Sequence, residues 1–305
     1  MDKKALHILK NIIFFLFFGG ILYFFSKTIY INYDKIKDFQ FHLNIFYFIL
    51  SIIFYFLFFL SLTFLWKYLL GEKKITFKEI FYINSVSWIS KYLPGKVAVI
   101  VTKVFYLHER GVPKRTSFIS CIYEQIFQII ASLVVSFPFI IYYFLGTENN
   151  SYIGLSVVFL IGFLISIHPF IFNNALNILL KILKKDPIEK HHFLGIFSII
   201  KYIFGYSLSM IIKGLSFVFL VWSITSIGFG DIPFLIFAWI FAGVVGIVSV
   251  FAPNGLGVRE GVLAFLLQFI LPVEISIIIS IFSRLWSTLC DGILGIYVGI
   301  EKLKK

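Results

Sequence analysis

Nine charged side chains lie inside segments that are otherwise apolar enough to cross a membrane. Six are cations and three are carboxylates: Lys91, Lys96, Lys103, Lys213, Arg259, Arg284, Glu124, Glu260 and Asp291. An ionisable group at the centre of a spanning helix costs about 2.5–3.5 kcal/mol on insertion scales, so such groups normally face the protein interior or a wet cavity. The excess of positive charge predicts a site for an anion at membrane depth.

Residues that break helices accompany these charges. They are Pro94 and Gly95 in one apolar stretch, and Pro253, Asn254, Gly255 and Gly257 in another. A half-helix that begins after such a break exposes unpaired backbone N–H groups, which favour an anion close by, and we expect these N-termini near Lys96 and Leu256. Irregular backbone is tolerated at membrane depth where it lines a cavity. The predicted substrate site consists of Lys96, Lys103, Glu124, Arg259, Glu260, Arg284 and Asp291.

Two of the segments carry a polar seam along one helical face. Glu124 aligns with Ser117, Cys121, Gln128 and Ser132, and Arg284 aligns with Ser280, Thr288 and Asp291. Spacings of three and four residues place side chains on one face of a helix. The seams either hold helices together or line the cavity. We expect Glu124 and Arg284 to lie in the same cavity, where a salt bridge between them would explain both charges.

The composition is that of a polytopic membrane protein. Hydrophobic residues make up 60% of the 305 residues and charged residues 14%, against about 25% charged in soluble domains. The net charge of +12 follows from insertion, because cytoplasmic loops concentrate Lys and Arg. We therefore expect no nucleic-acid partner. The two cysteines, Cys121 and Cys290, form no CxxC motif or disulfide framework.

The predicted fold is all-α, a single transmembrane domain over 1–305 with about seven full spans and two re-entrant hairpins of opposite orientation. The spans expected are 8–26, 43–66, 116–145, 152–172, 202–228, 232–251 and 275–299, and the interrupted segments are 79–107 and 254–271. Clusters of Lys and Arg lie at the N-terminus, at the C-terminus and in alternate loops. The positive-inside rule then places both termini in the cytoplasm of a multi-pass protein of the plasma membrane.

A matched spacing indicates an inverted repeat. Gly95 precedes Glu124 by 29 residues, and Gly255 precedes Arg284 by the same 29. Each unit contains a helix breaker, a half-helix, a short turn with proline, and a span with one ion in its first half. Inverted repeats with broken helices are typical of transporters that bind their substrate near the midplane.

The two charged regions, 90–124 and 250–291, resemble the signature regions of a known family. SKYLPGKVAVIVTKVFYLHERGVPKR followed by Glu124, and FAPNGLGVREGVL followed by Arg284, are similar to the lysylphosphatidylglycerol synthase transmembrane family, a flippase-type membrane domain. The family pattern is matched by Pro94, Gly95, Lys103 and Glu124, and by Pro253, Gly255, Gly257, Glu260 and Arg284. Departures are Asn254 and Ala98 in place of glycine, and Lys103 where arginine is commoner.

The resemblance implies a flippase-type function, and the residues suggest an anionic lipid headgroup as its substrate. The partner expected is such a membrane lipid, phosphatidylglycerol-like or linked to a polyprenyl phosphate. The soluble aminoacyl-transferase domain of the full-length synthases is missing from these 305 residues, and no hydrolase, P-loop or metalloprotease motif occurs, so we expect neither enzymatic activity nor a cofactor or metal. The alternatives are a secondary transporter of a small soluble anion and a non-transporting subunit of envelope glycan or lipid assembly. A homo-oligomer or a complex with an envelope-biosynthesis enzyme would fit the last alternative.

Overall fold

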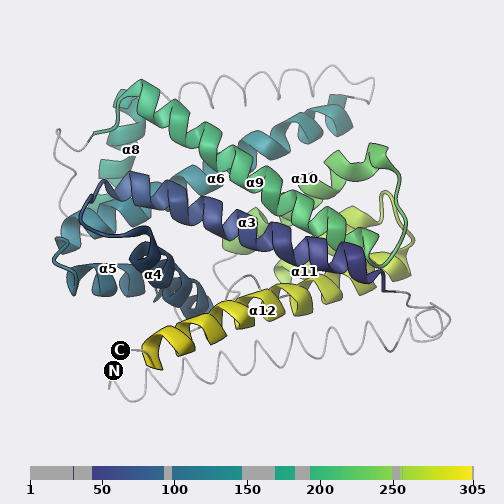
Figure 1. Ribbon diagram of the computed structural model, residues 1–305. Coiled ribbons are helices and arrows are strands. Elements are labelled where there is room, and N and C mark those ends of the chain that lie inside the picture. The colour runs from purple at the N-terminus through teal and green to yellow at the C-terminus, as the bar shows by residue number, and fades with distance from the viewer. Residues whose placement is uncertain are drawn as a thin grey trace, which may run out of the picture.

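The computed structural model describes residues 30, 43–92, 98–145, 169–182, 193–248, 255 and 257–303, and over these residues the chain is all-helical. Long helices run side by side, with shorter helices inserted between them (Figure 1). The helices are α3 (Ile45–Leu70), α4 (Phe77–Ile89), η1 (Ser90–Tyr92), α5 (Ala98–His108), α6 (Lys114–Leu145), α8 (Pro169–Ile182), α9 (Ile196–Trp222), η3 (Phe229–Asp231), α10 (Ile232–Val248), α11 (Val258–Leu267) and α12 (Val273–Leu303).

Five helices of the described part are long and apolar enough to cross a membrane, which makes the chain an integral membrane protein. They are Ile45–Leu70, Lys114–Phe139, Ile196–Trp222, Phe229–Ile247 and Val273–Leu303. They correspond to five of the seven predicted spans. The predicted span 8–26 and most of 152–172 lie outside the described residues.

Helix α9 begins and ends about one and a half turns earlier than the predicted span 202–228. The prediction places Lys201 in the loop before the span, which sets the start of the span too late. Lys201 instead lies exposed within the helix, with its ammonium 5.9 Å from the centroid of the Tyr68 ring. A lysine stem can lie along an apolar surface while its charge reaches polar surroundings. At the other end α9 stops at Trp222, whose indole N–H donates to the carbonyl of Ile227 in the following turn.

Local sequence signals set the ends of the first two helices. Asn44 caps α3 by accepting from the N–H groups of Phe46 and Tyr47, and Gly71, at φ +71°, ends it. Thr76 and Glu79 form a reciprocal capping box at the start of α4. Such caps satisfy backbone groups that have no partner inside the helix. The chain therefore reverses direction within a few residues between α3 and α4.

Two helix pairs, each containing at least one short helix, enter the bundle from opposite ends (Figure 1). In each pair, α4 with α5 and α10 with α11, the two helices contact each other. The pair α4 and α5 begins beside the end of α12, where the Lys78 ammonium lies 3.4 Å from the Glu301 carboxylate. The pair α10 and α11 leads directly into the start of α12. Since α12 runs the length of the bundle, the two pairs point towards each other (Figure 1).

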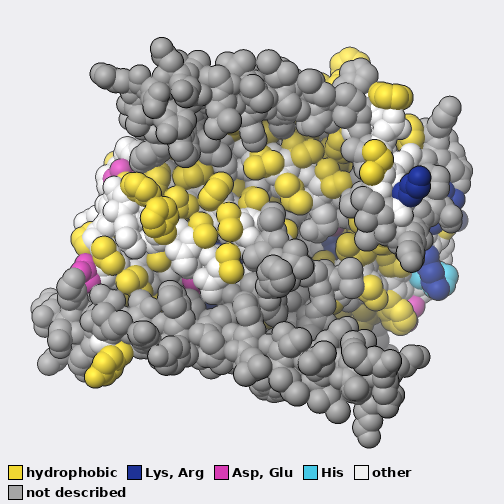
Figure 2. Space-filling model, turned by 180° about the vertical axis from the view of Figure 1, so that it is seen from behind, with side chains coloured by type: hydrophobic (Ala, Val, Ile, Leu, Met, Phe, Trp, Pro, Cys, Tyr) yellow, Lys and Arg dark blue, Asp and Glu magenta, His cyan; other side chains and the backbone are white. Residues whose placement is uncertain are grey.

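The basic loops gather at one end of the molecule. The end of α3, the start of α4, the α5–α6 turn, the start of α9 and the end of α12 all lie on the left of Figure 1. On the opposite view, apolar side chains fill the middle of the described surface, while Lys, Arg and His side chains appear at its right-hand edge (Figure 2). The basic clusters in the described loops therefore share one end, which fits the positive-inside pattern.

Gly255 holds the turn between α10 and α11 against α10 itself. Its φ is +67°, a conformation that side chains rarely adopt, and a Cβ on this residue would lie 2.7 Å from the Cα of Gly246. Both the backbone angle and the close approach therefore require glycine here. Gly95, which was expected to act in the same way in the first pair, lies outside the described residues, as do Pro94, Pro253 and Asn254.

We expect Gly255→Ala to lower the free energy of unfolding by about 1–3 kcal/mol, because the new methyl group meets backbone and the positive φ becomes strained. Gly261 is the matched control, since it lies in α11 and a Cβ there meets no atom within 4 Å. Gly261→Ala should be neutral or stabilise by about 0.5–1 kcal/mol through helix propensity. Thermal unfolding of the two variants in detergent measures both effects. Equal midpoints would contradict the close contact.

Candidate functional site

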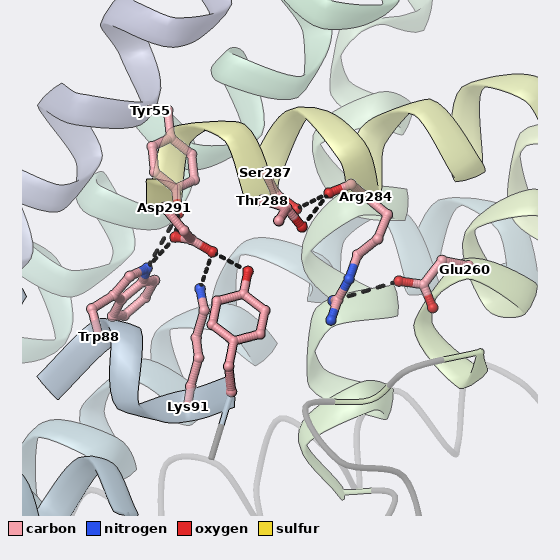
Figure 3. A network of polar contacts seen from close by, with 9 residues as sticks. Tyr55, Trp88, Lys91, Glu260, Arg284, Ser287, Thr288 and Asp291 are labelled. Carbon is pink, nitrogen blue, oxygen red and sulfur yellow. Dashed lines mark hydrogen bonds and ion pairs between the residues drawn. The ribbon is translucent and has the colours of Figure 1, made fainter. Parts of the chain in front are cut away.

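Asp291 of α12 is the centre of a buried hydrogen-bond network (Figure 3). Its Oδ1 accepts from the Tyr55 hydroxyl at 2.6 Å and from the Trp88 indole N–H at 2.8 Å. Its Oδ2 accepts from the Tyr92 hydroxyl at 2.5 Å and from the Lys91 ammonium at 2.7 Å. The carboxylate is 3% exposed, so these four donors replace the water that it has lost.

Two separate parts of the chain deliver these donors. Tyr55 comes from the buried face of α3. The other three come from the junction of α4 and η1, where residues 88, 91 and 92 are spaced by three and four positions and so share one face of a helical turn. The Lys91 ammonium also lies 4.5 Å from the centroid of the Trp88 ring. The network thereby joins α3, α4 and η1 to α12.

Arg284 lies about two turns before Asp291 on the same helix and forms an ion pair with Glu260 of α11. The distance from its Nη1 to the Glu260 Oε1 is 3.6 Å, and the Arg284 side chain is 14% exposed (Figure 3). The second carboxylate oxygen of Glu260 accepts from the Gly257 backbone N–H at 2.7 Å. Glu260 thus caps its own helix, and its negative charge already occupies part of the N-terminus of α11 that the sequence predicted for the substrate.

Two further cations lie within electrostatic range of this group. Arg259 interacts with Arg284 and Asp291, and Lys213 of α9 interacts with Arg259 and Lys91. Aromatic rings support both: the Arg259 guanidinium lies 3.9 Å from the centroid of the Trp239 ring, and the Lys213 ammonium lies 5.3 Å from that of Phe58. Neither has a carboxylate within 4 Å in the part of the chain described.

The group therefore contains more positive than negative charge. Its four cations are Lys91, Lys213, Arg259 and Arg284, and its two carboxylates are Glu260 and Asp291. We call these six residues the cationic cluster. Every member comes from the pair α10–α11, from α12 or from the elements that touch them, so the cluster forms only when the bundle is assembled.

A second ion pair lies apart from the cationic cluster. The Lys103 ammonium of α5 is 2.6 Å from the Glu124 carboxylate of α6, and both side chains are 3% exposed. The indole ring of Trp66 covers the ammonium at 3.8 Å from the ring centroid, and the Gln128 amide donates to the other carboxylate oxygen at 3.3 Å. All the charge here is matched within the protein, which fits a structural contact between helices better than an open binding site.

The predicted pairing of Glu124 with Arg284 is wrong. Glu124 bonds to Lys103 and Gln128, whereas Arg284 bonds to Glu260. In both halves of the chain the short helix supplies one ion and the following long helix the other, with the signs exchanged. Each of these two ion pairs therefore joins two helices that follow one another in sequence and contact each other.

The polar seams largely face inward, as predicted. Ser117, Cys121, Glu124 and Ser132 are buried on α6, and Ser280 and Asp291 are buried on α12. Thr288 departs from the prediction because it is exposed, and its hydroxyl donates to the backbone carbonyl of Arg284. Lys96 lies outside the described residues.

Sequence reasoning placed Lys91 and Lys213 at membrane depth but not in the site, and it missed Tyr55, Trp88 and Tyr92. The spacing of Trp88, Lys91 and Tyr92 is a helical-face signal that could have grouped these three. No local pattern links Tyr55 or Lys213 to α12, because both come from other helices. Among the described residues no three His, Cys, Asp or Glu side chains gather as metal ligands would.

The comparisons with known proteins identify one family. Residues 11–295 match the family described as the lysylphosphatidylglycerol synthase TM region. The match covers most of the chain, including both charged regions. No curated protein and no solved structure matches the sequence.

We expect Tyr55→Phe to lower the free energy of unfolding by about 1.5–3 kcal/mol, the typical contribution of a hydrogen bond to a charged group. Tyr47→Phe is the matched control on the same helix, because its ring packs on Phe219 and Trp222 and no hydrogen bond of its hydroxyl occurs in the described part of the chain. The control should change stability by less than about 0.5 kcal/mol. Chemical or thermal unfolding in detergent measures both. Equal losses would place Tyr55 outside the network.

The ion pair of Lys103 and Glu124 yields a second test. Glu124→Gln should cost about 3–5 kcal/mol of stability, because it leaves the buried Lys103 without its counter-ion. Adding Lys103→Met should restore most of that loss. Combining Glu124→Gln with Arg284→Gln should instead add the two single losses, because residues without a shared partner behave independently. Recovery in this second double variant would contradict the pairing.

Proposed function

We propose that this chain, which belongs to the lysylphosphatidylglycerol synthase TM region family, carries an anionic lipid across the plasma membrane by binding its headgroup in the cationic cluster. The observation that supports this is the charge of the cluster, in which four cations accompany two carboxylates. An anion completes the charge balance at a depth where uncompensated ions are costly. The lipid tails would stay in the bilayer.

The arrangement of the helices supports a transport role. We interpret the pairs α4–α5 and α10–α11 as re-entrant hairpins and the units that contain them as an inverted repeat. The 29-residue spacing, the entry of the two pairs from opposite ends and the ion pair in each unit all fit this interpretation. Inverted repeats in transporters place the substrate at their interface and allow one repeat to move against the other.

The orientation follows from the basic end of the bundle. Lys and Arg are concentrated in the loops at that end, so we place it, with both termini, in the cytoplasm. Because α10 forms one arm of the second hairpin in this proposal, six of the seven predicted spans cross the membrane completely, an even number that leaves both termini on one side. Two of these six, 8–26 and 152–172, fall mostly in residues that the structure does not describe. No bond is made or broken in such a process, and we assign no catalytic residue.

A vesicle assay tests the proposal. The purified full-length chain is reconstituted into liposomes that contain fluorescently labelled phosphatidylglycerol, and dithionite bleaches the label on the outer leaflet. We expect inner-leaflet label to become accessible faster than in empty vesicles, and Arg259→Gln to slow this at least about tenfold, because the variant removes a cation that has no carboxylate within 4 Å in the described part of the chain. Lys74→Gln is the control, since Lys74 is exposed in the turn before α4.

Lipid transport would be overturned if the folded protein moved no anionic lipid across the bilayer faster than empty vesicles do. The lipids tested include a labelled polyprenyl phosphate. Uptake of a small soluble anion under the same conditions would assign the cluster to a soluble substrate. Co-purification of a stable envelope enzyme without transport would indicate the non-transporting role.

A further inference from the structure

We infer that the cationic cluster binds a phosphate monoester, a group with two negative charges, between Lys213 and Arg259. This inference rests on the proposed function and specifies the chemical class of its substrate. It also assigns a binding role to Lys213, a residue of α9, which is outside both hairpins.

The first step is the charge balance inside the cluster. Asp291 is paired with Lys91 at 2.7 Å, and Glu260 is paired with Arg284 at 3.6 Å. These two pairs use all the carboxylates of the cluster and leave Lys213 and Arg259. Both lie against α10 one helical turn apart, because a Cβ on Gly243 would lie 3.9 Å from the Lys213 ammonium and a Cβ on Gly246 would lie 3.2 Å from the Arg259 Cβ. Two positive charges thus remain without a carboxylate within 4 Å among the described residues.

The residues that the structure does not describe between α10 and α11, and between η1 and α5, add no carboxylate to this balance. These residues are 249–254 and Leu256, which precede Arg259 in sequence, and 93–97, which precede α5. Neither stretch contains Asp or Glu, and the second adds Lys96. A ligand with two negative charges would match the two cations.

Two hydrogen-bond donors without an acceptor among the described residues lie in the region of Arg259. The indole N–H groups of Trp239 and Trp286 are buried and have no acceptor in the described structure, and the two rings lie 6.1 Å apart. Trp239 also carries the Arg259 guanidinium on its face. Indole, guanidinium and ammonium groups donate hydrogen bonds and accept none. A ligand rich in acceptor oxygens would satisfy them.

The geometry of Arg259 suits a phosphate. The Arg259 guanidinium carbon lies 3.9 Å from the centroid of the Trp239 ring, and the N–H groups of a guanidinium lie in its own plane, where they can bind two oxygens of one phosphate. A phosphate monoester has a second pKa near about 6, so at pH 8 it carries close to two charges and three acceptor oxygens. A phosphodiester such as phosphatidylglycerol carries one charge and matches only one of the cations.

The experiment compares two lipids that differ in this group. The full-length protein in detergent at pH 8 is titrated with phosphatidic acid, a monoester, and with phosphatidylglycerol of the same acyl chains, and tryptophan fluorescence reports binding. We expect tighter binding of phosphatidic acid, by at least about tenfold, and loss of that preference in Lys213→Met. Lys201→Met is the matched control, since Lys201 is exposed on the same helix.

A stability measurement separates binding from folding. Without lipid, Lys213→Met should unfold at the same temperature as the wild type or higher, because it removes a charge that has no partner. A lower midpoint would show that Lys213 supports the fold and would overturn the inference. Lys213→Arg keeps the charge and should retain the preference for the monoester.

The other outcomes of this experiment distinguish a failure of this inference from a failure of the proposed function. Equal binding of the two lipids, with no effect of Lys213→Met, would overturn the monoester site and leave anionic lipid transport in place. Binding of neither lipid would overturn both. Inorganic phosphate is the probe for a soluble source: saturation by phosphate alone, with loss in Lys213→Met, would support the monoester site and contradict a lipid substrate.

Discussion

A charge in apolar surroundings is tolerated only when an opposite charge or a set of hydrogen bonds compensates it, and this constraint organises the helix bundle. Each of the three carboxylates at depth is met by a cation from another element: Glu124 by Lys103, Glu260 by Arg284 and Asp291 by Lys91. These contacts join α5 to α6, α11 to α12 and η1 to α12. The ion pairs therefore determine which helices must stay together for the charges to be tolerated.

Aromatic faces provide a second way to accommodate the cations. Three of the five tryptophans lie against a cation: Trp66 against Lys103, Trp88 against Lys91 and Trp239 against Arg259. A ring face attracts a cation, and the interaction strengthens when water is excluded. Rings also leave the positive charge in place, whereas a carboxylate would cancel it. Arg259 can thus be held in position while its charge remains available for a ligand.

Each half of the chain contains an ion pair between a short helix and the following long helix, and the two pairs differ in length and in exposure. In the first half, Lys103 and Glu124 lie 2.6 Å apart and are sealed from solvent, so the pair binds α5 firmly to α6. In the second half the corresponding pair is longer, at 3.6 Å, and Arg284 is partly exposed. The cationic cluster gathers around this looser pair. The close pair holds its two helices together, whereas the longer pair leaves Arg284 partly exposed beside the proposed headgroup site.

Composition and local pattern were sufficient to identify an integral membrane protein, the five described spans and the inward seam of Glu124, because apolar length and helical periodicity are properties of neighbouring residues. The family followed from the resemblance of residues 90–124 and 250–291 to its signature regions. The short helices beside the predicted breaks followed from the same signals. Only the tertiary structure decided which ions pair. A seam shows that a side chain faces inward, but its partner depends on how separate helices pack, so Glu124 met Lys103 instead of Arg284, and Lys213 joined the cluster from α9.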